Sequence, residues 1–151
     1  MSKDVVVFDL DGTLSDGSHR LHLLPKKEDA HVTQAWDEFN LAVGDDGVFN
    51  DNLTLMNDLF GLGYRVVILT GRCDVARPVT EAWLDDCRAD FDELIMRKSG
   101  DNRQDIEFKE EELRKIGLDK ILCCFDDLER VAKHIRSLGV TCHLVTHYDD
   151  P

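Results

Sequence analysis

The chain has 151 residues, of which 42% are hydrophobic and 32% charged, as in a soluble globular domain with a sizeable core. No apolar stretch is long enough to cross a bilayer, and the first four residues do not resemble a signal peptide, so we expect no membrane association. The formal net charge of −13 opposes binding along an extended nucleic-acid duplex, although a local basic pocket can still hold one phosphate. The five cysteines, an odd number, predict reduced thiols and a cytoplasmic location.

The first predicted element is a short strand that ends in two acidic residues. The apolar run of residues 5–8 is typical of a strand buried on both faces, and Gly12 bounds it. Because side chains alternate along a strand, Asp9 and Asp11 should leave its end on the same side, as a magnesium site or as an acid and nucleophile pair. The alternative is the Asp-Gly turn of a hairpin, which we disfavour because no partner strand is evident after Leu14.

Residues 15–50 form the least regular part of the chain. A helix is predicted over residues 30–43, where apolar side chains recur at helical spacing before Gly44. The segment is too short for a domain of its own, and we expect a small helical insert that acts as a lid over the end of the first strand. Trp36 within it either stacks on a base or, as we prefer, packs in the core of the lid.

Strands and helices then alternate to the end of the chain. Strands are predicted at residues 64–69, 93–96, 120–125 and 140–145, and helices at 52–60, 78–87, 106–116 and 128–138. This order calls for right-handed crossovers. We therefore predict an α/β fold, a Rossmann-like three-layer sandwich with a central parallel five-stranded sheet, as one domain over residues 1–151 with 15–50 inserted.

Polar residues follow four of the five predicted strands. They are Asp9 and Asp11, then Thr70, Gly71 and Arg72, then the loop from Arg97 to Lys109, and finally Asp126 and Asp127. A parallel sheet brings the carboxyl ends of its strands to one edge, so these residues should form one site. Each motif is weak alone, since a turn or a helix N-cap would also explain it. Their joint placement is the stronger signal.

Charge indicates what such a site holds. Four crowded carboxylates need a cation, and carboxylate oxygens without histidine or cysteine favour a hard ion such as Mg²⁺. A phosphate monoester adds about two more negative charges, for which the candidate partners are Arg20, Arg72, Arg103 and Lys109. Phosphoryl transfer needs an in-line nucleophile and charge neutralisation, and a carboxylate nucleophile forms an aspartyl-phosphate that water cleaves.

The motifs resemble those of the haloacid dehalogenase superfamily of aspartate-nucleophile phosphatases. Residues 9–13 match its DxDGT signature, and Thr70, a later lysine and the Asp126-Asp127 pair match its other signatures in order. The resemblance implies that Asp9 is the nucleophile and Asp11 the general acid and base. It also implies that Thr70 and the lysine hold phosphoryl oxygens. The implied Mg²⁺ ligands are Asp9, the backbone carbonyl of Asp11, and one or both of Asp126 and Asp127.

The stretch after the third strand resembles the 3′-phosphatase domain of phage-type polynucleotide kinase-phosphatase more closely. Residues 97–109 match its R-x3-D-x-R-x-D-x3-K pattern. The resemblance implies that the phosphate-binding lysine is Lys109, oriented by Asp105 from one helical turn away, with Lys98 as the rival. The implied substrate-binding residues are Thr13, Arg20, Gly71, Arg72, Arg103 and Asp105.

Several alternatives stay open at this stage. The chain shows no kinase domain and no Gly-x4-Gly-Lys-Ser/Thr loop, so the substrate is either the 3′-phosphate of a nucleic-acid end or a mononucleotide, including a 5′-mononucleotide. A receiver-like signalling domain, phosphorylated on aspartate, would use similar residues, but in a different order along the chain. A binding module with decayed catalysis is the third alternative, although no motif residue is missing.

Overall fold

The computed structural model describes residues 2–145 and contains a five-stranded parallel sheet with the order β5-β4-β1-β6-β7. Its strands are β1 (Val5–Phe8), β4 (Arg65–Cys73), β5 (Glu93–Arg97), β6 (Ile121–Asp126) and β7 (Cys142–Leu144). The first strand is central, because β4 and β5 lie on one side of it and β6 and β7 on the other. The predicted α/β fold with five parallel strands is thus confirmed.

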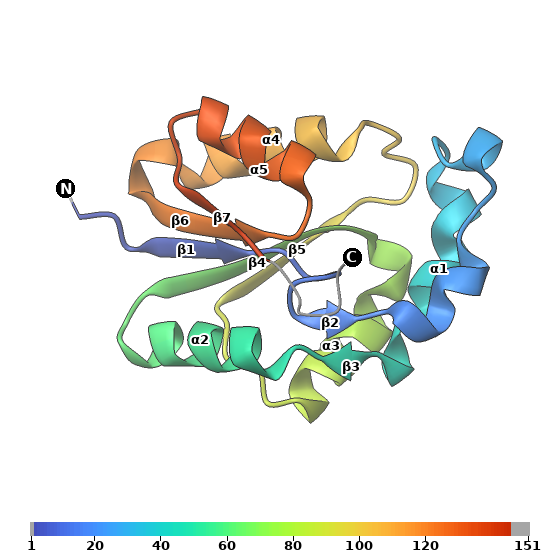
Figure 1. The fold of residues 1–151 in the computed structure, drawn as a ribbon, viewed down its shortest axis with the longest axis horizontal. Helices are drawn as coiled ribbons and strands as arrows, with labels where there is room; N and C mark the ends of the chain where they lie inside the picture. The colour runs from blue at the N-terminus through green and yellow to red at the C-terminus, as the bar shows by residue number, and fades with distance from the viewer. Residues whose placement is uncertain (1, 146–151) are drawn as a thin grey trace.

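Helices cover both faces of this sheet and form the outer layers of a three-layer sandwich (Figure 1). One layer contains α4 (Asp105–Ile116) and α5 (Glu129–Ser137), and the other contains α2 (Asn50–Gly61) and α3 (Arg77–Asp86). Val5 and Val7 of β1 pack in the core under α4 and α5, whereas Val6 and Phe8 pack in the core under α2 and α3. The alternation of the strand therefore fills two separate cores, as expected for a strand buried on both faces.

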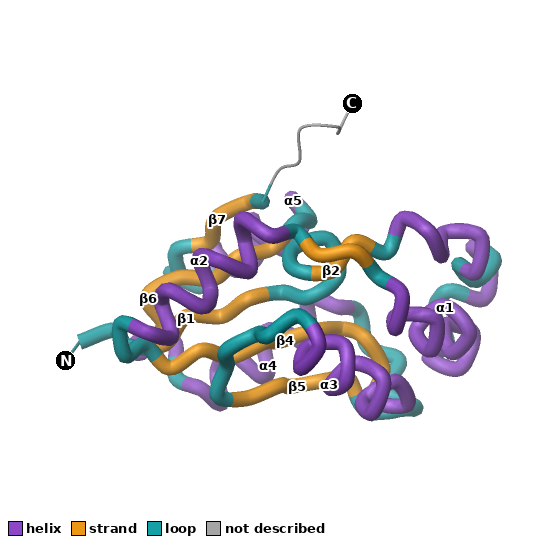
Figure 2. Tube along the Cα trace, turned by 90° about the horizontal axis from the view of Figure 1, so that it is seen from below, coloured by secondary structure: helices purple, strands orange, loops and turns teal. Residues whose placement is uncertain are grey.

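The insert differs from the helix predicted over residues 30–43. It contains 3-10 turns at Ser18–Leu23, Lys27–Asp29, Thr33–Trp36 and Ala42–Asp45, and one short helix, α1 (Asp37–Leu41). The β-branched Val32 is extended, with φ −109° and ψ 125°, which breaks the helical run before Thr33. The insert stands beyond the carboxyl ends of the sheet strands (Figure 2).

Within residues 2–145 the first strand forms no hairpin with the chain after Leu14, as expected, because its partners β4 and β6 both pair with it in parallel. The two-residue strand β2 (Ser15–Asp16) pairs antiparallel with β3 (Gly47–Val48) at the far end of the insert. These strands are too short to show a periodic pattern, and the insert separates them in sequence. Their pairing ties the two ends of the insert together at the base of the site.

The strand β4 also differs from its prediction, because it continues past Leu69 to Cys73. Its pairing with β5 shifts register between Thr70 and Cys73, which is the position of the Thr70-Gly71-Arg72 motif. Such irregularities bend a strand and redirect its side chains. The polar motif is thus part of the sheet edge rather than a loop after it. Among the described residues, no helix has the length and apolar character needed to cross a membrane.

Candidate active site

Three carboxylates meet at the carboxyl ends of β1 and β6. Asp9, Asp126 and Asp127 each offer one oxygen, and these oxygens all lie within 4.8 Å of one another. Burial raises the pKa of Asp9 well above its ordinary value, and the charges of Asp126 and Asp127 raise it further, while Lys109 opposes the rise. Oxygen donors at this spacing fit one hard divalent ion, so these three residues could hold Mg²⁺. The predicted ligation through the backbone carbonyl of Asp11 stays a prediction.

Lys109 supplies the positively charged side chain that faces these three carboxylates. Its Nζ lies 3.0 Å from Oδ1 of Asp9 and 2.8 Å from Oδ2 of Asp126, and the residue is only 3% exposed. Burial lowers the pKa of Lys109, but the two carboxylates outweigh burial and raise it. Three carboxylates against one ammonium leave a formal excess of two negative charges. A divalent cation matches that excess.

Asp11 lies in a different electrostatic environment, between two buried arginines. Nη2 of Arg20 lies 2.5 Å and Nη2 of Arg72 lies 2.7 Å from its Oδ1. Burial alone would raise the pKa of Asp11, but Arg72 and Arg20 lower it below its usual value. The side chain of Asp11 is nevertheless 36% exposed, because it opens into the cavity described below. Both arginines line the same cavity as Asp11, although their own side chains are almost fully buried.

Asp46 binds the guanidinium of Arg20 and lies close to that of Arg72. The sequence analysis did not identify it. Its fully buried carboxylate accepts two hydrogen bonds of 2.8 Å from Arg20, and it lies 3.7 Å from Arg72. The Ser15 hydroxyl donates to it as well, and His19 contacts it at 2.8 Å. No pattern marks Asp46, since it lies at the end of an irregular insert and reaches the site only through the pairing of β2 with β3. An acidic residue in an irregular loop carries no signal of its own, and nothing in the sequence distinguishes Asp46 from its neighbour Asp45.

Of the two threonines in the motifs, Thr13 contacts Asp9 and Thr70 lines the cavity. The Oγ1 of Thr13 donates a hydrogen bond of 3.4 Å to Oδ2 of Asp9, and Thr13 is completely buried. Thr70 lines the cavity, and its Oγ1 accepts a hydrogen bond of 3.0 Å from the backbone N–H of Arg72. Gly12 has φ +79°, and any Cβ on it would clash with the carboxylate of Asp127. The DxDGT turn therefore requires glycine at position 12, because a side chain there would displace the carboxylate of Asp127.

The loop after β5 is organised by Arg97, to which the sequence analysis gave no individual role. Its guanidinium donates to the carbonyls of Gly71, Asp101 and Arg103 and, at 2.7 Å, to Oδ1 of Asp105. The prediction that Asp105 orients Lys109 needs correction. The hydrogen bonds of Lys109 go to Asp9 and Asp126, whereas Asp105 raises the pKa of Lys109 only through its charge.

The remaining predicted residues of this loop lie closer to solvent. Arg103 lines the outer part of the cavity with a side chain that is 40% exposed, and it forms ion pairs with Asp101 and Glu111. Gly71 lines the cavity where a Cβ would clash with the carboxylate of Asp105. Lys98 is exposed and does not line the cavity. Of the two candidate lysines, the structure therefore places Lys109 beside Asp9.

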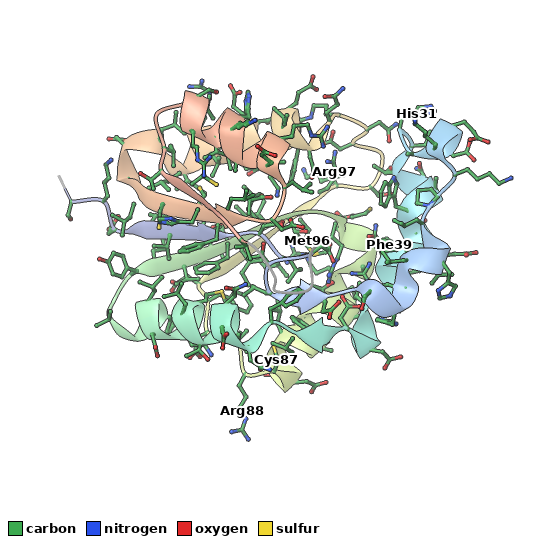
Figure 3. The ribbon with its side chains drawn as sticks, in the orientation of Figure 1. His31, Phe39, Cys87, Arg88, Met96 and Arg97 are labelled. Atoms are coloured by element: carbon green, nitrogen blue, oxygen red, sulfur yellow. The ribbon has the colours of Figure 1, made fainter. Side chains whose placement is uncertain are left out.

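These groups open into one cavity of about 780 Å³. Its inner end contains the acidic group and Asp11 with the two arginines, and its outer wall is formed by the insert and the loop after β5. Figure 3 shows Phe39 on the side of the insert that faces the sheet and Arg97 at the base of the facing loop. The cavity is large enough for a whole nucleotide. Whether the insert closes over it as a lid stays a prediction.

Comparison with known proteins identifies the family. The model of the family described as "Polynucleotide kinase PNKP phosphatase domain" matches residues 3–149 of the chain. No curated protein matched the chain.

Solved structures give the same relationship. A structure of the Pnkp1/Rnl/Hen1 complex is 26% identical, with a TM-score of 0.78 over 99% of this chain and 48% of that one. A structure of the Pnkp1/Rnl/Hen1 RNA repair complex is 27% identical, with a TM-score of 0.74 over 97% of this chain and 43% of that one. This chain thus spans less than half the length of both.

A more distant likeness concerns the fold alone. A haloacid dehalogenase-like hydrolase from Streptococcus pneumoniae is 15% identical, with a TM-score of 0.62 over 95% of this chain and 84% of that one.

The resemblance inferred from the four strand-end motifs is confirmed, and it disfavours a receiver-like domain. The chain belongs to the family of PNKP phosphatase domains within the haloacid dehalogenase superfamily of phosphatases.

Proposed function

We propose that this phosphatase domain is a Mg²⁺-dependent phosphomonoesterase that forms an aspartyl-phosphate on Asp9 and acts on the 3′-phosphate of a nucleic-acid end or nucleotide. The observation that carries this proposal is the placement of Asp9. Its carboxylate lies in the cavity between Lys109 and Thr13, next to Asp126 and Asp127, and opposite Asp11 with its two arginines. A nucleophile, a charge-neutralising group and an acid therefore converge on one point.

The first step transfers the phosphoryl group to the protein. A carboxylate oxygen of Asp9 attacks the phosphorus atom, and the bond between phosphorus and the ester oxygen breaks. The electron pair stays with the leaving oxygen, which takes a proton from the protonated form of Asp11, a minority form because Arg72 and Arg20 lower the pKa of Asp11. When bound, Mg²⁺ supplies Lewis-acid stabilisation of the phosphoryl charge. Arg20, Arg72 and Lys109 supply fixed positive charge around the same group.

The second step restores the free carboxylate of Asp9. Asp11, now ionised, takes a proton from a water molecule whose oxygen attacks the phosphorus of the aspartyl-phosphate. The bond between phosphorus and the Asp9 oxygen breaks, and inorganic phosphate leaves with the former water oxygen. Asp11 thus alternates between acid and base while Asp9 is consumed and regenerated.

The choice of nucleic-acid substrate rests on the family and on charge. The matched family is defined by polynucleotide kinase phosphatase domains, and one of the similar structures is an RNA repair complex. The net charge of −13 disfavours binding along a long duplex, whereas the buried arginines of the cavity suit a single terminal phosphate. A 5′-mononucleotide is the competing substrate.

The test is a panel of 3′- and 5′-phosphates, presented on mononucleotides and on oligonucleotides, with Mg²⁺ or with EDTA. We expect turnover that needs the metal and favours 3′-phosphates. Asp9→Asn should abolish it, while Asp85→Asn, on the exposed face of α3, serves as the matched control. Undiminished turnover in the Asp9→Asn protein would rule out the mechanism. A preference for 5′-phosphates would replace the substrate with mononucleotides.

A further inference from the structure

The cavity is far larger than a phosphoryl group, and its two ends differ in chemistry. The inner end is charged, whereas the wall supplied by the insert includes Leu21, Ala30, His31, Trp36 and Phe39. A phosphate and its sugar cannot fill about 780 Å³. The proposed function leaves this aromatic wall without a role.

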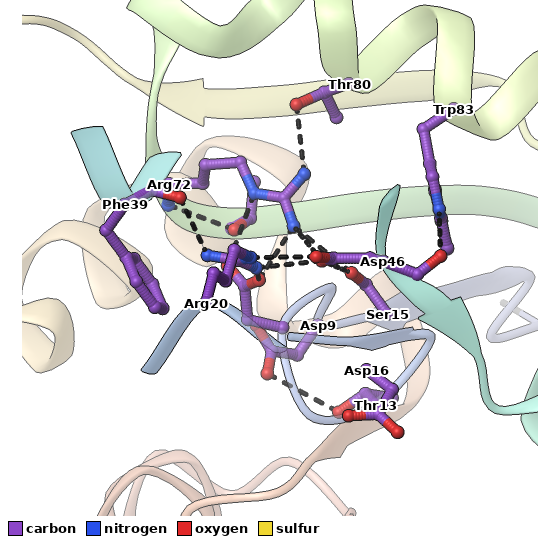
Figure 4. A network of polar contacts seen from close by, with 12 residues as sticks. Asp9, Thr13, Ser15, Asp16, Arg20, Phe39, Asp46, Arg72, Thr80 and Trp83 are labelled. Atoms are coloured by element: carbon purple, nitrogen blue, oxygen red, sulfur yellow. Dashed lines mark hydrogen bonds and ion pairs between the residues drawn. The ribbon is translucent and has the colours of Figure 1, made fainter. Parts of the chain in front are cut away.

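Trp36 is held in a fixed orientation on this wall. Its indole Nε1–H donates a hydrogen bond of 2.9 Å to the carbonyl of Ala30, so its polar group is already satisfied. Its ring and that of Phe39 form a T-shaped pair, with centroids 5.8 Å apart and planes at 76°. Phe39 in turn lies 4.0 Å beneath the guanidinium of Arg20, which holds Asp11 (Figure 4). An unbroken line of contacts therefore runs from the phosphate end of the cavity to the indole.

A second set of contacts fixes the wall from the opposite side. The backbone N–H of Thr33 donates to Oδ1 of Asn102 at 2.8 Å, and the N–H of Gly100 donates to Oγ1 of Thr33 at 2.9 Å. These hydrogen bonds join the insert to the loop after β5, only three residues from Trp36. A preorganised aromatic surface loses little conformational freedom when a planar ligand binds it.

We propose that Trp36 is the stacking platform for the base of the nucleotide whose phosphate lies at Asp9, an inference that rests on the proposed function. The half-buried indole lines the same cavity as Asp9 and offers a flat apolar surface on the wall formed by the insert. Every nucleobase has a π-face, so stacking of this kind tolerates all four bases. A base stacked here is unpaired, and the subsite therefore takes single nucleotides or unpaired strand ends.

The kinetic test compares two substrates that differ only in the base: deoxyadenosine 3′-phosphate and deoxyribose 3-phosphate. In Trp36→Ala, the ratio of kcat/KM for the nucleotide to kcat/KM for the sugar phosphate should fall about tenfold or more. Trp36→Phe, which keeps an aromatic face, should retain most of the ratio. Leu41→Ala is the matched control, because Leu41 is an exposed residue of the insert outside the cavity wall.

A binding measurement without turnover complements the kinetics. In the Asp9→Asn protein, deoxyadenosine 3′-phosphate should quench tryptophan emission saturably, whereas inorganic phosphate should not. The chain has two tryptophans, and Trp83 is buried under β1, so the Asp9→Asn, Trp36→Phe double variant should lose the quenching.

The outcomes separate the two proposals. A wild type that hydrolyses neither substrate contradicts the proposed function. A wild type that hydrolyses both, with an unchanged ratio in Trp36→Ala, overturns the stacking platform and assigns Trp36 to packing within the insert. Equal quenching with and without Trp36 overturns it as well.

Discussion

The two aspartates at the end of β1 are two residues apart, yet their surroundings are opposite in charge. Asp9 lies among carboxylates, and burial together with Asp126 and Asp127 raises its pKa. Asp11 lies between Arg20 and Arg72, which lower its pKa against the effect of burial. The site thus has an acidic half around Asp9 and an arginine half around Asp11.

The two halves differ in formal charge: the charges of the arginine half balance, whereas the acidic half has an excess of negative charge. In the arginine half, Arg20 and Arg72 face Asp11 and Asp46, so two positive charges meet two negative ones. In the acidic half, Lys109 alone faces three carboxylates. The charges of the arginine half are therefore balanced within the fold. The acidic half has a formal excess of two negative charges, which a bound divalent cation would balance.

The largest expected effect comes from Asp9. Asp9→Asn removes the nucleophile but keeps the shape of the side chain, so kcat should fall on the order of 10⁴-fold or more. The measurement is single-turnover hydrolysis of a 3′-phosphorylated oligonucleotide, with acid quench to trap any phosphorylated protein. The wild type should yield trapped phosphoprotein and the variant none. Phosphoprotein in the variant would place the nucleophile elsewhere.

Asp11→Asn should have the next largest effect, on the order of 10²–10⁴-fold, because it removes the general acid and base. The loss should depend on the leaving group. An alkyl ester needs protonation of its oxygen, whereas p-nitrophenolate leaves without it, so the first step should be impaired less with p-nitrophenyl phosphate. Burst kinetics with both substrates measure this step directly. Equal losses in that step would mean that Asp11 serves only to hold its arginines.

The acidic half could be predicted from the sequence far better than the arginine half. Asp9, Asp126 and Asp127 follow regular buried strands, and the parallel sheet alone brings strand ends together. Lys109 lies on a regular helix directly after the third of these strand-end loops. The positions of the aspartates depend on periodicity, which a single sequence shows, whereas the choice of Lys109 over Lys98 depends on the resemblance to the polynucleotide kinase-phosphatase motif.

The arginine half depends on parts of the chain that have no period. Arg20 and Asp46 lie at the two ends of the insert, and they meet only because two-residue strands pair across it. The helix predicted over residues 30–43 failed for a related reason, since Val32 is extended and Thr33 is tied to a distant loop. Contacts of this kind are decided by tertiary structure rather than by local propensity.

Asp46→Asn tests whether the arginine half depends on its buried anchor. The substitution keeps the shape of the side chain but removes the charge that holds Arg20, so we expect KM for a phosphate monoester to rise about tenfold. The inhibition constant of inorganic phosphate should rise in parallel, because the same arginines bind it. Asp45→Asn, at the exposed neighbouring position, is the matched control. A change in kcat alone would contradict a role in holding the phosphate-binding arginines.

The smallest expected effect is on stability, and it separates the halves most directly. A cation that binds only the folded protein at a hundred times its dissociation constant adds about 2.7 kcal/mol of stability. For a chain of this size, that should raise Tm by roughly 5–10 °C in Mg²⁺ compared with EDTA. Asp127→Asn should shrink this shift because it removes a ligand, yet in EDTA it should melt no lower than the wild type, because it also relieves repulsion with Asp9 and Asp126. Asp46→Asn should melt lower in both buffers and keep the full shift, because Asp46 holds Arg20 and is not one of the predicted Mg²⁺ ligands. If Asp46→Asn abolished the Tm shift and Asp127→Asn preserved it, the cation would lie in the arginine half and not among the three carboxylates.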